Sequence, residues 1–210
     1  MQEITLTHVE AAIRAMAETA LANESHFSEL DGACGDGDFG TSLATGFRIV
    51  LKDWETIDRS SIASFLQKVG MIITSNVGGC SGPIWGTGFL RAAGIARGKA
   101  VLTLPDLVAM AQSAMQGMMA RGGAQLGDKT LLDALAPATA QLAATAHAGD
   151  VLAAWAAATA AAEATIESTR PWTARRGRQS FTGDRSQGTV DPGIVGVATM
   201  MEAIGAAVVR

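Results

Sequence analysis

Apolar residues recur at helical spacing in eight segments of this 210-residue chain, and no segment reads convincingly as a strand. These segments begin near Thr7, Ser42, Ser61, Pro83, Thr103, Leu131, Asp150 and Asp191. Hydrophobic residues make up 48% of the chain, aromatic residues only 5%, and Tyr is absent, which suits close-packed helices better than sheets. The pattern predicts an all-α fold, an antiparallel up-down bundle or barrel of eight helices. One domain spanning 1–210 is expected at this length.

Local signals place the ends of several helices. Thr7–Glu10 is interpreted as a capping box, Thr103–Asp106 starts the fifth helix, and Asp150 caps the seventh. Asp191 followed by Pro192 is typical of an N-cap with Pro at the first helical position.

Charge and composition argue against several classes of protein. A net charge of −4 offers no basic surface for nucleic acid. Cys34 and Cys80 lack metal-site spacing and are expected to be free thiols of a cytoplasmic protein. The N-terminal residues lack the features of a signal peptide, and the alanine-rich stretch 153–162 is expected to be a buried helix, not a membrane span.

The stretch from Asp31 to Ser42 carries the strongest chemical signal. Asp31, Asp36 and Asp38 are hard oxygen donors, and the glycines between them allow sharp turns and expose backbone N–H groups. The stretch leads into a helix at Thr41 and Ser42, where an anion is favoured. Carboxylates beside a phosphate cradle need a cation between them, so the sequence predicts a Mg²⁺–polyphosphate site.

Three other interpretations of this stretch are possible from its residues. Gly35–Gly40 fits the spacing of a dinucleotide-binding loop, but no strand precedes it. A calcium-binding EF-hand loop starting at Asp36 would need Glu where Phe47 stands. A solvated turn rich in Asp and Gly is the remaining alternative.

Three further loops carry polar signals. Val77–Pro83 is Gly-rich and opens a helix, Gly127–Thr130 resembles the tail of a Walker A loop but has the wrong spacing, and Pro171–Asp191 carries four arginines. Alternate loops of an up-down bundle share one end, which places these three with the Asp31–Ser42 stretch. One rim would then hold the carboxylates, two anion cradles and a guanidinium cluster, a combination suited to a Mg-nucleotide.

Four motifs, taken in order, resemble those of the nucleotide-binding L subunit of dihydroxyacetone kinase. They are Leu30–Gly40, Val77–Pro83, Gly127–Thr130 and Gly183–Gly193. The resemblance implies an eight-helix barrel that binds ADP or ATP through two Mg²⁺ ions at its rim. It makes Asp31, Asp36 and Asp38 the metal ligands and implies phosphoryl transfer by metals and positioning, with no catalytic side chain assigned.

The resemblance also implies a set of nucleotide contacts. Phosphate-binding positions match Phe39, Gly40, Thr41, Ser42, Cys80 and Ser81; adenine-pocket positions match Gly122 and Leu131; C-terminal contacts match Arg178, Asp191, Pro192 and Gly193. Two departures from the family pattern concern substrate choice: Phe39 replaces a usual His, and Gly183–Ser186 has Asp where Glu is usual. The expected acceptor is dihydroxyacetone or a related short ketose, and the two departures suggest a diverged subfamily that acts on a four-carbon ketose or a similar triose.

The family implies a kinase subunit with a division of labour. A separate K subunit holds the keto-sugar on a histidine, and this chain brings the phosphoryl donor. Bound ADP is rephosphorylated by a phosphotransferase-system protein, or ATP exchanges freely, and the sequence does not decide. It also leaves the oligomeric state open, a homodimer included.

Two other functions were considered. One is a nucleotide-loaded regulatory module without turnover, and the other is a metal-dependent phosphohydrolase. A hydrolase needs a base near the carboxylates, yet His8, His26 and His147 all lie outside the Gly-rich motifs. Lys129 is expected to be a structural or rim residue.

Overall fold

The computed structural model describes residues 3–147 and 149–208; the ends of the expected 1–210 domain lie outside this range. In these residues the chain forms nine α-helices and no strand. They are α1 (Leu6–Ala22), α2 (Glu24–Gly32), α3 (Phe39–Lys52), α4 (Ile62–Asn76), α5 (Ser81–Ala96), α6 (Leu104–Gly122), α7 (Leu131–Ala144), α8 (Val151–Ser168) and α9 (Pro192–Val208). Two 3₁₀ segments, η1 (Trp54–Thr56) and η2 (Arg178–Ser186), complete the description. The predicted all-α class is confirmed.

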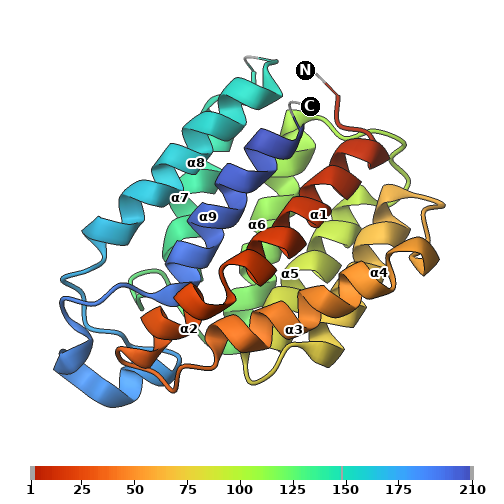
Figure 1. The fold of residues 1–210 in the computed structure, drawn as a ribbon. Helices are drawn as coiled ribbons and strands as arrows, with labels where there is room; N and C mark the ends of the chain where they lie inside the picture. Colours follow the sequence, from red (N-terminus) through yellow and green to blue (C-terminus); the bar gives the residue numbers. More distant parts are fainter. Residues whose placement is uncertain (1–2, 148, 209–210) are drawn as a thin grey trace.

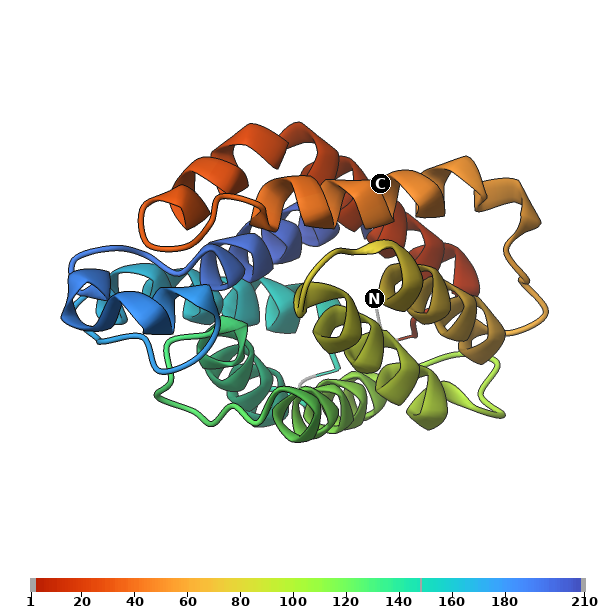
Figure 2. The same ribbon diagram turned by 90° about the horizontal axis from the view of Figure 1, so that it is seen from below.

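The eight predicted helices follow one another around a ring (Figures 1 and 2). Helix α1 packs on α3, and each helix from α3 to α8 packs on the next helix in the chain. Helix α9 packs on α1 and closes the ring. Neighbouring helices run in opposite directions (Figure 1). The connections therefore alternate between two ends of the molecule, one of which also carries the chain termini.

Side-chain caps explain most of the helix starts. Ser61 Oγ accepts a hydrogen bond from the Ser64 N–H at 3.0 Å, and the Asp150 carboxylate accepts from Leu152. The predicted capping box at Thr7–Glu10 is wrong. The box is formed instead by Thr5 and His8, whose Nδ1 accepts from the Thr5 N–H at 3.0 Å. The helix begins two residues earlier than predicted because Ile4 pairs with Leu102 and fixes the entering chain.

Helix α2 was not predicted. Its nine residues are mostly polar, and only Phe27 and Asp31 are buried. Isolated helices this short are marginal in water, so α2 depends on its contacts with α3. The Phe27 ring packs against Phe39, with centroids 6.1 Å apart. This contact also explains why α3 begins at Phe39, three residues before the predicted Ser42.

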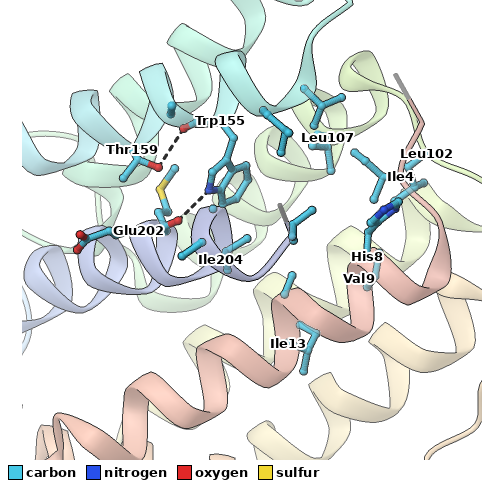
Figure 3. Close-up of a pocket in the computed structure, with 18 of the residues that line it drawn as sticks. Ile4, His8, Val9, Ile13, Leu102, Leu107, Trp155, Thr159, Glu202 and Ile204 are labelled. Atoms are coloured by element: carbon cyan, nitrogen blue, oxygen red, sulfur yellow. Dashed lines mark hydrogen bonds between the residues drawn. The ribbon is translucent and has the colours of Figure 1, made fainter. Parts of the chain in front are cut away.

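The helices enclose a continuous apolar core that is incompletely filled at the end carrying the termini. A cavity of about 470 Å³ lies between α1, α6, α8 and α9, lined by residues such as Ile4, Leu107 and Trp155 (Figure 3). Trp155 spans it toward α9, where its Nε1–H donates to the Met201 carbonyl at 2.8 Å. A second cavity of about 210 Å³ lies beside it. The described residues lining both cavities include none of the predicted site residues.

None of the helices in the described part of the chain has the length and apolar character needed to cross a bilayer. The alanine-rich stretch 153–162 lies within α8, as expected, and packs against α7 and α9.

Candidate functional site

The four loops with polar signals lie at the end of the ring opposite the termini (Figure 2). A side chain at Gly78 would touch Ser42 Oγ, so the second Gly-rich loop lies against the start of α3. Arg178 reaches Asp36, and Lys129 reaches the Ser186 carbonyl, which join the remaining two loops to the same region. The predicted gathering of these loops at one rim is confirmed.

Three carboxylates form a compact cluster at this rim. Asp31, Asp36 and Asp38 each offer an oxygen atom, and these atoms lie within 4.8 Å of one another. Asp31 is buried on α2, whereas the other two are exposed. Burial raises the pKa of Asp31, a hydrogen bond from Phe39 opposes this rise, and the neighbouring charge of Asp36 adds to it. Three oxygen donors in this arrangement fit a hard divalent cation such as Mg²⁺.

Two glycines are required for this geometry. A Cβ at Gly35 would overlap the Asp31 carboxylate, and one at Gly40 would overlap the Glu24 carbonyl of α2. Gly37 adopts a left-handed conformation with φ +77°. The glycines therefore let the backbone close around Asp31 and let α2 and α3 approach closely.

Two backbone N–H groups in the first turn of α3 donate to side chains of α2. The Phe39 N–H donates to Asp31 Oδ2 at 3.2 Å, and the Thr41 N–H donates to Ser28 Oγ at 3.2 Å. The Phe39 side chain points into the core, where its ring contacts Phe27. Only the backbone of residue 39 is thus available to the site.

A second helix N-terminus lies beside the first. Cys80 is the N-cap of α5 and is exposed, and Ser81 is its first residue. Gly79 has φ +60° with open space around it, whereas a Cβ at Gly82 would overlap the Val77 carbonyl. The loop therefore brings α5 close to Val77 and leaves its N-terminal end accessible.

One arginine of the Pro171–Asp191 segment faces the carboxylates. Arg178 Nη1 lies 2.5 Å from Asp36 Oδ2, and its Nη2 lies 3.9 Å from Asp38. Arg176 instead pairs with Asp128, at 3.5 Å. The prediction singled out Arg178 from this cluster, and the structure brings it to the carboxylates.

The remaining predicted contacts lie at the starts of α7 and α9 and at the end of α6. A Cβ at Gly193 would lie 3.2 Å from the Leu131 Cβ, so these two positions are adjacent. Asp191 Oδ1 accepts from the Ile194 N–H at 2.9 Å and caps α9, as predicted. Burial raises the pKa of Asp191 to about 7, although the nearby Lys129 ammonium opposes the rise. Gly122 ends α6 against the Ile84 side chain.

Sequence reasoning missed two residues that shape this rim. Asp133 accepts from the Gly127 and Thr130 N–H groups at 2.6 and 2.8 Å and holds the third loop. The Thr130-to-Asp133 spacing of a capping box was a readable signal. Ser28 carried no such signal, because its contact with Thr41 exists only when α2 packs on α3.

The fold and the rim together define a class of protein: a ring of antiparallel helices with a cluster of three carboxylates and the N-termini of α3 and α5 at one end. A family model described as DAK2 domain matches residues 33–206. The chain belongs to the DAK2 domain family, and the resemblance to dihydroxyacetone kinase L subunits is confirmed.

Individual relatives cover most of the chain. The chain is 37% identical over 183 residues to the PEP-dependent dihydroxyacetone kinase, ADP-binding subunit DhaL of Escherichia coli K12, covering 87% of each chain. It is 32% identical over 202 residues to the L-erythrulose 1-kinase of Mycolicibacterium smegmatis, covering 94% of this chain and 35% of that one. The dihydroxyacetone kinase of C. freundii in complex with AMP-PNP and Mg²⁺ has a similar structure, with a TM-score of 0.74 and 26% identity. That alignment covers 94% of this chain, which spans only 33% of the larger protein.

Proposed function

We propose that this chain binds ADP or ATP with Mg²⁺ at the rim and acts as the phosphoryl-donor subunit of a short-ketose kinase. The observation that carries the proposal is the cluster of Asp31, Asp36 and Asp38, with oxygen atoms within 4.8 Å beside the α3 N-terminus. The names of relatives, an ADP-binding kinase subunit and an erythrulose kinase, support it.

The three carboxylates would hold the Mg²⁺, and the family resemblance implies two ions. Arg178 lies beside two of these carboxylates, with its guanidinium 2.5 Å from Asp36 and 3.9 Å from Asp38. A metal ion held by these carboxylates would lie next to Arg178, whose planar array of donors is suited to binding a phosphate oxygen. The Arg178 side chain is half exposed and could turn toward such a phosphate without disturbing the core.

Helices α3 and α5 would bind the phosphate groups. Their N-termini carry partial positive charge, and Thr41, Ser42, Cys80 and Ser81 lie in or next to the first turns. The adenine would lie toward Gly122 and Leu131, with Asp191–Gly193 beside it. In this arrangement the nucleotide would lie across the rim, with its phosphates at the carboxylates.

Bound Mg²⁺ would neutralise the charge of the phosphate oxygens during transfer. The distribution of histidines supports transfer rather than hydrolysis. His8 caps α1 at the other end of the ring, His147 lies in the connection between α7 and α8, and the His26 side chain faces solvent. Among the described residues, the hydrogen bonds made by a histidine are those of His8 with Thr5, away from the three carboxylates.

The acceptor would be a keto-sugar held by a separate K subunit, with this chain acting as one nucleotide-binding domain. The name of the E. coli relative, a PEP-dependent kinase with an ADP-binding subunit, supports the variant in which ADP stays bound over free exchange of ATP. The erythrulose kinase supports a four-carbon acceptor as an alternative to dihydroxyacetone.

The test begins with the nucleotide carried by the purified protein. The protein is denatured, and released nucleotide is identified by chromatography, alongside Asp36→Ala and the control Asp58→Ala, which removes an exposed carboxylate in the loop between η1 and α4. We expect ADP from the unmodified chain and the control, and none from Asp36→Ala. If all three are empty, Mg²⁺-dependent binding of ADP and ATP is measured by calorimetry. Absence of binding in the unmodified chain contradicts the proposal.

Turnover separates a kinase subunit from a regulatory module. The nucleotide-loaded chain is mixed with a ketose-binding subunit, and phosphorylation of dihydroxyacetone and of erythrulose is followed by mass spectrometry. A phosphorylated ketose supports the donor role. Nucleotide binding without transfer to either ketose favours a nucleotide-loaded regulatory module.

A further inference from the structure

Lys129 is a fully buried cation, and the proposed binding of nucleotide and Mg²⁺ does not involve it directly. It lies in the Gly127–Thr130 loop and adopts a left-handed conformation with φ +63°, the only non-glycine residue of the described chain with a positive φ. A buried ammonium costs free energy unless its donors are satisfied, and a left-handed backbone adds strain at a residue with a side chain. Such a residue persists only where surrounding contacts compensate for both costs.

The compensation comes from three backbone carbonyls. Lys129 Nζ donates to the carbonyls of Ser186, Trp172 and Arg170, at 2.7, 3.0 and 3.3 Å. These are as many acceptors as an ammonium has N–H groups. The acceptors lie at the start and at the end of the stretch from 170 to 186, so one side chain joins both ends of the segment that carries Arg178.

The loop around Lys129 adds further contacts to this segment. The Arg175 N–H donates to the Asp128 carbonyl at 2.9 Å, and the Arg176 side chain pairs with the Asp128 carboxylate. Asp133 holds the loop itself by accepting from Gly127 and Thr130. The Gly127–Thr130 loop is therefore held in place and supports the arginine segment, residues 170–186.

Lys129 also lies between other parts of the rim. Burial lowers the pKa of Lys129, and the nearby carboxyl group of Asp191, which caps α9, opposes this fall. The Cys34 thiol donates to the Arg185 carbonyl at 3.3 Å, which connects the arginine segment to the turn after Asp31. Lys129 thus lies where the carboxylate turn, the arginine segment and the α9 N-terminus meet.

We propose that Lys129 is a positioning residue, which fixes the 170–186 segment so that Arg178 faces the metal carboxylates and the nucleotide phosphates. This inference rests on the proposed nucleotide function. It assigns to the Gly127–Thr130 motif a role distinct from that of a Walker lysine: the ammonium binds protein carbonyls and acts on the phosphates through Arg178.

The test compares Lys129→Met with Lys129→Gln, which keeps two N–H donors, and with Lys99→Met. Lys99 pairs with Asp106 near the opposite end of the ring and provides the same chemical change away from the rim. Amide hydrogen exchange is measured on the nucleotide-free proteins. We expect faster exchange confined to residues 173–188 in Lys129→Met, a smaller effect in Lys129→Gln and none in Lys99→Met.

Binding of ADP with Mg²⁺ provides the second measurement. We expect Lys129→Met to weaken it on the order of tenfold, as for residues that orient a binding group. In an Arg178→Ala background the same substitution is expected to have little further effect, because the two residues act in series.

Four outcomes overturn the inference. They are unchanged exchange in the segment, unchanged binding of ADP, an equal loss of binding with and without Arg178, and failure of both Lys129 variants to fold, which would make the residue purely structural. Absence of binding in the unmodified chain instead contradicts the proposed function, and the exchange measurement alone then decides whether Lys129 holds the segment.

Discussion

Asp191 carries a protonation change that links the rim to stability. Burial raises its pKa from 3.8 to about 7, against the opposing charge of Lys129 and with a further rise from Asp133. A carboxyl group with a raised pKa in the folded state keeps its proton while the unfolded chain loses it. The folded protein therefore loses stability as the pH rises from about 4 to about 7.

Replacing Asp191 by Asn should remove this part of the pH dependence. The amide oxygen can still cap α9 by accepting from Ile194, but it carries no charge to bury. A pKa difference of one is worth about 1.4 kcal/mol. We therefore expect the free energy of unfolding of Asp191→Asn, relative to that of the unmodified chain, to rise by up to a few kcal/mol from pH 5 to pH 8. Urea unfolding at both pH values measures the gain.

Asp106→Asn is the control for this measurement. Burial of Asp106 favours the proton, but hydrogen bonds from Thr103 and the Lys99 ammonium outweigh it and hold the pKa of Asp106 below 3.8. The group stays charged from pH 5 to pH 8, so its substitution should shift stability equally at both values. A gain for Asp191→Asn that does not change with pH would show that its carboxyl group is not protonated in the folded chain.

The close crossing of α2 and α3 depends on one glycine. A Cβ at Gly40 would overlap the Glu24 carbonyl and press on Ser28, both backbone-anchored parts of α2. Gly40→Ala must therefore separate the two helices, and we expect a loss of about 2 kcal/mol or more in the free energy of unfolding. Loss of the α2 contact should also weaken Mg²⁺ binding, because Asp31 is on α2.

Gly94→Ala is the matched change in α5. A Cβ at Gly94 would meet no atom within 4 Å, so only the helix propensity changes. We expect a stabilisation of about 0.5–1 kcal/mol, measured by urea unfolding beside Gly40→Ala. Equal effects of the two substitutions would contradict the importance of the α2–α3 crossing.

The helices that could be predicted are those with their own apolar periodicity and caps. Ser61, Asp150 and Asp191 cap α4, α8 and α9 as their sequence positions indicate. Helix α2 could not be found this way, because few of its residues are apolar and it is stabilised by Phe27 against α3. The Thr5 box was missed for a related reason: the pairing of Ile4 with Leu102, 98 positions apart along the chain, sets where α1 begins.

The candidate site was predictable as far as loop order and residue type determine it. Alternating connections placed the Asp, Gly and Arg loops at one rim, and the three aspartates form a cluster there. The contacts of Lys129 were not predictable, since its three acceptors are backbone carbonyls that any sequence provides. Sequence can identify groups that bind a ligand, but not the side chain that holds them in place through backbone atoms.

The rim joins segments that are far apart in the chain, so a ligand bound there should stabilise the whole ring. Asp31 belongs to α2, Arg178 to η2 and Asp191 to the start of α9, and unfolding would separate all three. A ligand that binds only the folded state stabilises it by about 2.7 kcal/mol at a concentration 100 times its Kd. For a chain of 210 residues this raises Tm by roughly 5–10 °C.

We therefore expect ADP with Mg²⁺ to raise Tm in this range, and ADP with EDTA to have little effect because the carboxylates then repel the phosphates. Asp36→Asn should lose most of the increase, whereas Asp58→Asn should retain it. Differential scanning calorimetry of the three proteins measures these shifts. An equal rise for Asp36→Asn and the unmodified chain would place the nucleotide away from the carboxylate cluster, since only a ligand bound through those oxygen atoms depends on the charge at residue 36.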